Sequence, residues 1–524
     1  MAPLAVKIKH AGKIHDLQLD PDQPPTIFKE AVYQVTGIPV DRMKVMVKGG
    51  TLKVCSFTII PPHALSLETF LVGPKEGQTF MVIGAAGELP KPPEKPIVFM
   101  EDMDDTSLAQ ALSLPVGLKN LGNTCYMNAT LQAMRAIPEL QIALQEGAPS
   151  GLPSALKSLY TQMSRTTESV VPGGFLASLR QAFPQFAERA QNSKAIGTML
   201  AAYSQQDAEE CWIQLTNSLK EVPGLPVSSS EASVSKKFID QYLTGEMRRE
   251  LKCDEAPEEP PTVSFEKVLK IECNISISTN YMLQGIKEAL DQKIEKISPS
   301  LGRDALYTST SRLSRLPSYL TVHMRRVKFP TDFDALELVT EELKEKMAPL
   351  STKLKDVEAN RAERRTIRKR SAAVRGEASS SAPLAVPSQP SSTEDPQEMQ
   401  VDSSLEAESV YRQRELKELE ALVHPDLQAD VGCSITGQYE LIAIVTHKGA
   451  AADSGHYMGF VKKSAIQSAT LSPSGASLAD DDDDWYKFDD DKVSIFPKDK
   501  LPTLEGGGED SAAYVLLYKT KPLA

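Results

Sequence analysis

Several features that would narrow the function quickly are scarce in this sequence. It has six cysteines in 524 residues, and none has the close paired spacing of a disulfide framework or a metal knuckle. This scatter favours a reducing compartment. No stretch approaches the roughly 20 apolar residues of a membrane-spanning helix, and the N-terminus lacks the apolar segment of a signal peptide. We therefore expect a soluble protein, cytoplasmic and nuclear, with no membrane partner.

Positive charge is also in deficit. The chain has 58 lysines and arginines against 70 aspartates and glutamates, a formal net charge of -12. Proteins whose main activity is non-specific binding of nucleic acid carry basic surfaces instead. We therefore expect no nucleic-acid partner. The length allows about two to four domains and a large buried core.

The first 84 residues have the pattern of a small module in which strands surround one helix. Apolar and polar residues alternate at 4–10, 14–19, 42–48 and 78–84. A helix is predicted over 25–37, where Gly37 supplies its C-terminal end. Residues 54–74 fit this pattern poorly and are interpreted as an atypical insertion.

This order of elements resembles an integral ubiquitin-like domain, a β-grasp fold, over residues 1–84. The resemblance implies a docking module, because the chain continues past Gly84 into a proline-rich stretch instead of ending in Gly-Gly. Met46 lies in the strand that carries the apolar binding patch of this fold, and a place in the core is equally open for it.

The rest of the chain divides into a linker and one large domain. Residues 85–114 are proline-rich and then acidic, which indicates a linker. Residues 115–520 have the mixed helix and strand patterns of an α+β domain. Two low-complexity stretches, at about 359–410 and 464–484, are predicted to be disordered insertions. The first opens with the basic run RAERRTIRKR, for which a nuclear-localisation signal and a solvated helix face are both open.

One cysteine is distinguished by its position. Cys125 follows the segment GLKNLGNT and begins a stretch with helical spacing of apolar residues. A thiol at a helix N-terminus faces the positive end of the helix dipole, which favours the nucleophilic thiolate. Asn120 could donate from its amide to an oxyanion at the same point. An inert core cysteine is the alternative interpretation.

A cysteine nucleophile needs a base, and the base needs an acceptor that orients it. Among the seven histidines, His456 is the best candidate, because it opens the second strand of a predicted hairpin after Gly455. His447, at the end of the first strand, is the alternative. Asp489 ends another alternating strand and could accept a hydrogen bond from the imidazole, although residues 489–491 could also be only a turn.

Six motifs occur in the order in which ubiquitin-specific proteases have them. They are GLKNLGNTCYMNATLQAM, QQDAEECW, LPSYLTVHM, SGHYMGFVKK, WYKFDDDKVS and AAYVLLY. The chain resembles that family, and with the leading ubiquitin-like domain it is similar to its proteasome-associated members. The resemblance implies a papain-like cysteine protease domain with thumb, palm and fingers.

The resemblance also assigns roles to individual residues. It implies Cys125 as nucleophile, His456 as general base and then acid, Asp489 as the orienting carboxylate and Asn120 as oxyanion donor. Residues implied to support the cleft or bind ubiquitin are Gln205, Gln206, Asp207, Asp490 and Tyr457. For the first three, which match the family's glutamine box, helix N-cap chemistry is an equally open interpretation.

The implied activity is hydrolysis of the isopeptide bond after the C-terminal glycine of ubiquitin, which would recycle ubiquitin and tune degradation. The implied partners are ubiquitin, ubiquitinated proteins and the proteasome regulatory particle, bound through the ubiquitin-like domain. We expect no cofactor and no metal, because Cys253 and Cys273 stand singly where many relatives have paired cysteines. The alternative is a non-catalytic adaptor that binds ubiquitin and the proteasome. The segment after Arg326 is shorter than in relatives, and this weakly favours the adaptor.

Overall fold

The computed structural model describes most of the chain. The described residues are 3–20, 23, 25–40, 42–47, 50–52, 59–60, 75–84, 115–189, 203–226, 236–274, 279–324, 327–374, 406–449, 454–469, 483–506 and 511–523. The predicted linker, 85–114, lies outside them. The chain divides into two compact units, Met1–Phe99 and Met100–Ala524.

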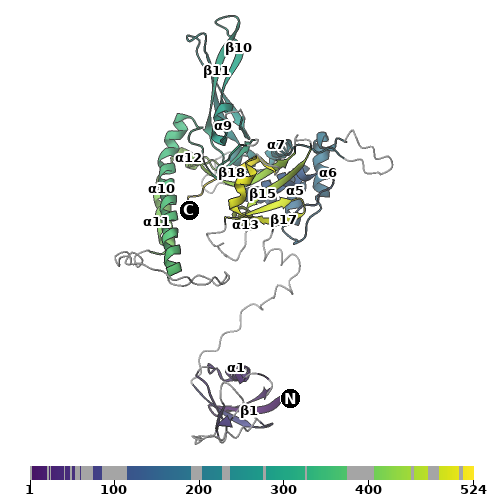
Figure 1. The fold of residues 1–524 in the computed structure, drawn as a ribbon, viewed down its shortest axis with the longest axis vertical. Coiled ribbons are helices and arrows are strands. Elements are labelled where there is room, and N and C mark those ends of the chain that lie inside the picture. Colours follow the sequence, from purple (N-terminus) through teal and green to yellow (C-terminus); the bar gives the residue numbers. More distant parts are fainter. Residues whose placement is uncertain are drawn as a thin grey trace, which may run out of the picture. The chain divides into compact units, whose positions relative to one another are not determined.

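The first unit is one sheet with one helix packed on it (Figure 1). Its elements are β1 (Leu4–His10), β2 (Lys13–Leu19), α1 (Pro25–Thr36), β3 (Lys44–Val47), β4 (Gly50–Leu52), β5 (Ile59–Ile60) and β6 (Thr79–Ile83). The strand order is β2-β1-β6-β3-β4-β5, and β1 and β6 are parallel. Phe28 of α1 meets Phe80 edge to face at 5.7 Å, within the apolar core of this unit. Of the predicted insertion, only Ile59–Ile60 is described.

The second unit begins with helices. These are α3 (Cys125–Arg135), α4 (Pro138–Gly147), α5 (Leu152–Met163), α6 (Gly173–Ala182), α7 (Ala208–Ser218) and α8 (Phe238–Tyr242), with short 3-10 turns η2 (Pro184–Ala187) and η3 (Leu219–Glu221). All residues of α3 are buried, so this helix lies in the interior of the unit. Among the described residues, no helix combines the length and apolarity needed to cross a membrane.

An eight-stranded sheet forms the other half of the main core. Its members are β9 (Ile271–Glu272), β12 (Tyr319–His323), β13 (Asp332–Asp334), β14 (Gln438–Lys448), β15 (His456–Lys462), β16 (Trp485–Asp489), β17 (Lys492–Phe496) and β18 (Ala512–Thr520). The order is β17-β16-β15-β14-β18-β12-β9, with β13 paired to β14. The predicted hairpin is β14 with β15, and α13 (Lys463–Ala469) and η4 (Lys498–Leu504) flank the sheet.

A second sheet of four strands projects from this core (Figure 1). It consists of β7 (Gly245–Cys253), β8 (Thr262–Val268), β10 (Asp291–Ile297) and β11 (Asp304–Arg315), in the order β10-β11-β7-β8, with α9 (Met282–Leu290) at its base. The mixture of helices and mainly antiparallel sheets confirms the predicted α+β class.

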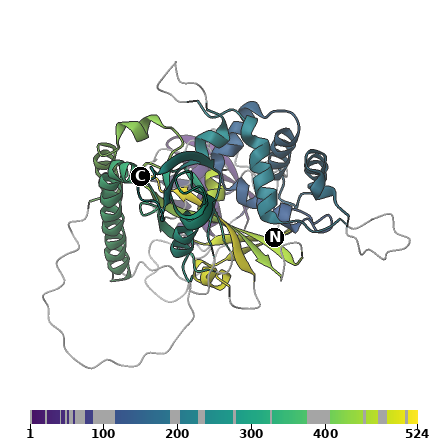
Figure 2. The same ribbon diagram turned by 90° about the horizontal axis from the view of Figure 1, so that it is seen from above.

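Three further helices are α10 (Glu341–Val374), α11 (Glu408–Glu420) and α12 (Pro425–Ala429). The paired α10 and α11 lie on the opposite side of the unit from the blue helices α3–α6 (Figure 2). The prediction that disorder starts at residue 359 is wrong, because α10 continues to Val374. Carboxylates of α11 order this basic stretch: Arg361 binds Glu415, and Arg364 binds Glu408 and Glu415.

The prediction that disorder starts at residue 464 is also wrong. Residues 464–469 belong to α13, which directly follows β15. The remaining parts of the two insertions, 375–405 and 470–482, lie outside the described residues.

Candidate active site

Cys125 is the first residue of α3 and is 3% exposed. The loop before it turns through left-handed backbone at Gly122 and Asn123. Oδ1 of Asn120 accepts hydrogen bonds from the backbone N–H groups of Gly122 (2.9 Å) and Thr124 (3.3 Å), which fixes this turn. No side chain caps α3 at Thr124. The thiol therefore faces the uncapped, positive end of a buried helix dipole.

His456 and Asp489 come from neighbouring strands and face each other. His456 begins β15 and Asp489 ends β16, and these two strands are antiparallel partners. Nε2 of His456 lies 2.6 Å from Oδ1 of Asp489. This leaves Nδ1 for the thiol of Cys125. The hydrogen bond with Cys125 is the largest cause that raises the pKa of His456 to about 9; burial opposes it and Asp489 adds to it. The site thus favours the protonated imidazolium form of His456.

Close packing brings the cysteine helix to these strands. α3 packs on β15 at Gly459, where an added Cβ would lie 3.3 Å from the carbonyl oxygen of Ala129. At the loop, an added Cβ on Gly117 would lie only 2.4 Å from the carbonyl oxygen of Asp491. Glycine at these two positions lets the two halves of the core approach at the distance the site requires.

Asp490 joins the turn after β16 to the cysteine loop. Its backbone is left-handed, with φ of 53°, and its carbonyl oxygen accepts from the N–H of Leu118 at 3.0 Å. Its carboxylate accepts from the side-chain amides of Asn120 (2.9 Å) and Asn128 (2.8 Å). Asp490 therefore positions the Asn120 amide beside Cys125 from the opposite half of the core.

Comparison with known proteins identifies the family. The model of the family described as "Ubiquitin carboxyl-terminal hydrolase" matches residues 116–518, which include all of these side chains. The chain belongs to this family. It is a ubiquitin-specific protease, which is a cysteine hydrolase, as the resemblance implied.

Relatives match over nearly the full length of this ubiquitin-specific protease. "Ubiquitin carboxyl-terminal hydrolase 6" of Schizosaccharomyces pombe is 36% identical over 100% of both chains. "Ubiquitin carboxyl-terminal hydrolase 6" of Arabidopsis thaliana is 32% identical over 98% of each. "Ubiquitin carboxyl-terminal hydrolase 14" of Caenorhabditis elegans is 25% identical over 98% of this chain and 93% of its own. The likeness therefore includes the first unit as well as the second.

The three residues that the resemblance matches to a glutamine box directly precede α7. Asp207 is the N-cap of that helix, because its Oδ1 accepts from the N–H of Glu209 at 2.7 Å, and its Oδ2 accepts from the hydroxyl of Tyr514 at 2.6 Å. The N-cap interpretation therefore describes Asp207. Gln205 and Gln206 are half-buried, and Nε2 of Gln205 has no hydrogen-bond partner among the described residues.

Aromatic rings pack behind His456. Tyr457 is 1% exposed, which suits a supporting place better than direct contact with ubiquitin, and burial raises the pKa of its hydroxyl. The ring of His447, the alternative base, contacts that of Tyr457 in a tilted arrangement, with 4.5 Å between ring centroids. Its Nε2 lies 2.9 Å from the carbonyl oxygen of Ser454. His447 thus secures the β14–β15 hairpin from the position directly opposite Tyr457.

Two contributors to the site were missed from the sequence. Asn128 is buried on α3 and donates to Asp490, and Tyr514 bonds to Asp207. Asn128 could have been found because it is a polar residue one turn after Cys125 on a helix that is buried on all sides. Tyr514 lies in an apolar strand and gave no comparable signal.

Donor groups for a metal ion occur in two places among the described residues. One set is His456, Asp489 and Asp490 in the site itself, and the other is Glu209, Glu272 and His323. In the second set Lys270 already forms ion pairs with both glutamates, so a metal ion would have to displace a lysine.

The two single cysteines that motivated the metal prediction lie apart. Cys253 and Cys273 belong to separate hydrophobic clusters, so they do not share a site. The five cysteines that the structure describes are all unpaired and buried.

Proposed function

We propose that Cys125, His456, Asp489 and Asn120 are the catalytic residues of this deubiquitinase, and that they hydrolyse the isopeptide bond after the C-terminal glycine of ubiquitin. The observation that carries the proposal is the position of His456, which bonds to Asp489 through Nε2 and whose pKa the neighbouring Cys125 thiol raises. A nucleophile next to a base, with the base next to an acceptor that orients it, makes a hydrolytic triad.

The proposed reaction uses Cys125 as a thiolate and His456 as an imidazolium. The Cys125 thiolate attacks the glycine carbonyl carbon, and the amide of Asn120 donates to the oxyanion that forms. The C–N bond then breaks while the His456 imidazolium gives its proton to the leaving lysine amine. Water attacks the resulting thioester, His456 takes its proton, and ubiquitin leaves with a free carboxylate as the thiolate reforms.

Asn120 has the donor that this mechanism requires. A side-chain amide carries two N–H groups, and one of them donates to the carboxylate of Asp490. The second can donate to substrate, and Asn120 is exposed. If the domain has the papain-like arrangement that the resemblance implies, the helices around α3 form the thumb, the eight-stranded sheet forms the palm and the four-stranded sheet forms the fingers.

A ubiquitin probe with a C-terminal electrophile tests the proposal directly. We expect the wild-type chain to form a covalent adduct at Cys125, located by mass spectrometry. The Cys125→Ala variant should form none and should still bind ubiquitin. The matched control is Cys211→Ala, at a buried thiol whose pKa burial raises. Adduct formation in Cys125→Ala, or its loss in Cys211→Ala with the fold intact, would contradict the assignment.

We further propose that the first unit is a ubiquitin-like domain that docks on the proteasome regulatory particle, which would place the enzyme in the cytoplasm and nucleus. A row of apolar residues, Met46, Met81 and Ile83, supports this proposal. On the face of the sheet away from α1, Met46 pairs with Met81, which pairs in turn with Lys9. Met81 is 51% exposed and Ile83 is 51% exposed. Exposed apolar side chains that adjoin one another are typical of a protein-binding surface.

A further inference from the structure

The bond that Cys125 is proposed to cleave joins two polypeptides, ubiquitin and the target protein whose lysine carries it. The resemblance assigns the glutamine box, residues 205–207, to the ubiquitin side of the site. The target protein must also approach Cys125, because its lysine nitrogen is the leaving group of the reaction. The site therefore needs a second surface, for the target protein, beside the cysteine loop.

The loop before the nucleophile is exposed at residues 119–123, whereas Cys125 itself is buried. The end of this loop next to Cys125 is joined to the ubiquitin side. There the side-chain amide of Asn123 donates to the carbonyl oxygen of Tyr203 at 2.9 Å, two residues before the glutamine box. Ubiquitin bound along the glutamine box would cover this end of the loop, which leaves the other end for the target protein.

The other end of the loop lies against a segment that precedes α6. The N–H of Lys119 donates to the carbonyl oxygen of Val170 at 2.9 Å, and the N–H of Val170 donates to that of Gly117 at 3.0 Å. Side chains alternate in such a parallel bridge, so Leu118 and Val170 share a buried face, at 0% and 3% exposed. Lys119 and Val171 lie on the opposite face, which is exposed.

Two apolar side chains are exposed at this end of the loop. Val171 is 52% exposed and Leu121 is 38% exposed. Single exposed apolar residues are normal on a protein surface, but these two belong to joined segments next to the oxyanion donor, Asn120. At Gly122 an added Cβ would meet nothing within 4 Å, so the loop faces open space here. A chain that passes the oxyanion donor can therefore reach both apolar side chains.

A groove of about 960 Å³ continues from Val171 along α5. One wall is α5, and the other is the segment 165–171. Most of the lining consists of serine, threonine and glutamine side chains, with two cations, Lys157 and Arg165, and one carboxylate, Glu168. The groove thus carries more positive than negative charge in a chain whose net charge is -12. Polar and acidic side chains of a partner complement such a surface.

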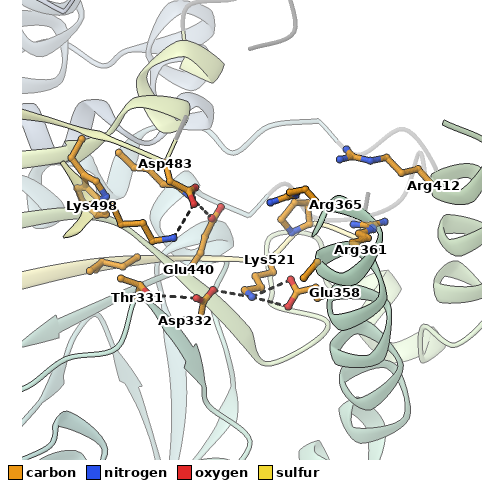
Figure 3. Close-up of a pocket in the computed structure, with 15 residues that line it drawn as sticks. Thr331, Asp332, Glu358, Arg361, Arg365, Arg412, Glu440, Asp483, Lys498 and Lys521 are labelled. Carbon is orange, nitrogen blue, oxygen red and sulfur yellow. Dashed lines mark hydrogen bonds and ion pairs between the residues drawn. The ribbon is translucent and has the colours of Figure 1, made fainter. Parts of the chain in front are cut away.

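A second cavity, of about 480 Å³, lies where α10 and α11 meet the eight-stranded sheet (Figure 3). It contains Lys462 of β15 and Trp485 of β16, at the strand ends away from His456 and Asp489. Figure 3 shows its lysines paired with carboxylates along these strand ends. None of the residues that line it belongs to the cysteine loop or to the segment 165–171, so this cavity does not adjoin the leaving group.

We propose that Leu121, Val171 and the groove beyond them bind the target protein beside its modified lysine. This surface rests on the proposed function, because a target protein takes part only if Cys125 cleaves an isopeptide bond. An apolar residue next to the lysine covers Leu121 and Val171. Acidic or polar residues farther along the target chain lie against Lys157 and Arg165. Target proteins with this composition around the lysine are therefore the preferred substrates.

Two substrates that share ubiquitin and differ in the leaving group test this proposal on the full-length chain. One is the ubiquitin amide of aminomethylcoumarin, and the other is ubiquitin linked to the lysine of a short peptide that has apolar and then acidic residues beside the lysine. Val171→Asp should lower the ratio of kcat/KM, peptide over coumarin, by about fivefold or more, chiefly through KM for the peptide substrate. The matched control, Val410→Asp, changes a valine that is 42% exposed on α11, and it should leave the ratio at the wild-type value.

A second variant tests the charge of the groove. Wild type should cleave the acidic peptide with a higher kcat/KM than a peptide with arginine at the acidic positions, and Arg165→Glu should abolish this preference. An unchanged ratio in Val171→Asp, or an equal fall in Val410→Asp, would overturn the surface while leaving the proposed function intact. A wild-type chain that cleaves neither substrate would overturn the proposed function and this surface together.

Discussion

At the residue scale, the charge of His456 is set by its two neighbours. Its side chain is 37% exposed, so burial alone would lower its pKa, and the hydrogen bonds with Cys125 and Asp489 outweigh that effect. The proton is therefore held until about pH 9. Below that pH His456 can protonate the leaving amine, and above it the proton is lost.

This predicts the alkaline limb of the pH profile. For a ubiquitin C-terminal amide substrate, kcat/KM should fall as pH rises through about 9. Asp489→Asn removes a negative charge that raises the pKa of His456, so the limb should move to lower pH, and the rate should also fall. The exposed Asp499→Asn variant serves as the control and should keep the wild-type limb. A limb that stays in place in Asp489→Asn would show that His456 does not supply the proton.

Asp490 acts on a different step. Because its carboxylate holds the Asn120 and Asn128 amides, Asp490→Ala should lower kcat by about 10²–10³ with little change in KM, as loss of an oxyanion donor does. The alkaline limb should move less than in Asp489→Asn, because the carboxylate that bonds directly to His456 is that of Asp489. Asn120→Ala should give a similar loss, and the double variant should be no worse than Asp490→Ala, because both remove the same interaction. Additive losses in kcat would show that Asp490 works independently of Asn120.

At the scale of elements, the site depends on how closely the cysteine loop approaches the turn after β16. Gly117→Ala places a Cβ against the backbone of Asp491, which cannot move as a flexible side chain would. We expect kcat to fall at least tenfold, with a smaller relative effect on KM. The control is Gly174→Ala on α6, where an added Cβ meets nothing within 4 Å. Steady-state kinetics of both variants, with circular dichroism to verify folding, decide between them; equal kinetics would contradict the role of this contact.

The local sequence pattern correctly predicted those helices and strands whose formation depends mainly on residues near them in the sequence. Alternation predicted β1, β2, β3 and β6, and helical spacing after Cys125 predicted α3. It failed for the second half of α10, where polar composition indicated disorder. The residues that order this helix are far away in sequence: Glu415 is 54 positions from Arg361, and both side chains are at most 15% exposed. No window around RAERRTIRKR contains those carboxylates.

In the candidate site, too, the sequence predicted only the features that depend on nearby residues. Cys125, His456 and Asp489 each had a local signal: a helix start, a hairpin and a strand end. The sequence could not place Asp490 between two amides, because its left-handed backbone and its contact with Leu118 exist only once the helical half packs on the sheet. Asn128 was missed for the same reason.

At the scale of the whole molecule, the chain joins a catalytic unit to a separate unit with its own core. Because the apolar row of the first unit contains no catalytic residue, its loss should affect recruitment and leave the chemistry intact. We expect Met81→Lys with Ile83→Lys to abolish co-purification with the proteasome while hydrolysis of a ubiquitin amide substrate by the isolated enzyme changes less than twofold. Ile27→Lys is the matched control, since this residue is 48% exposed on α1 and lies outside the row. Proteasome binding that survives the double substitution, or fails equally in Ile27→Lys, would contradict docking through this face.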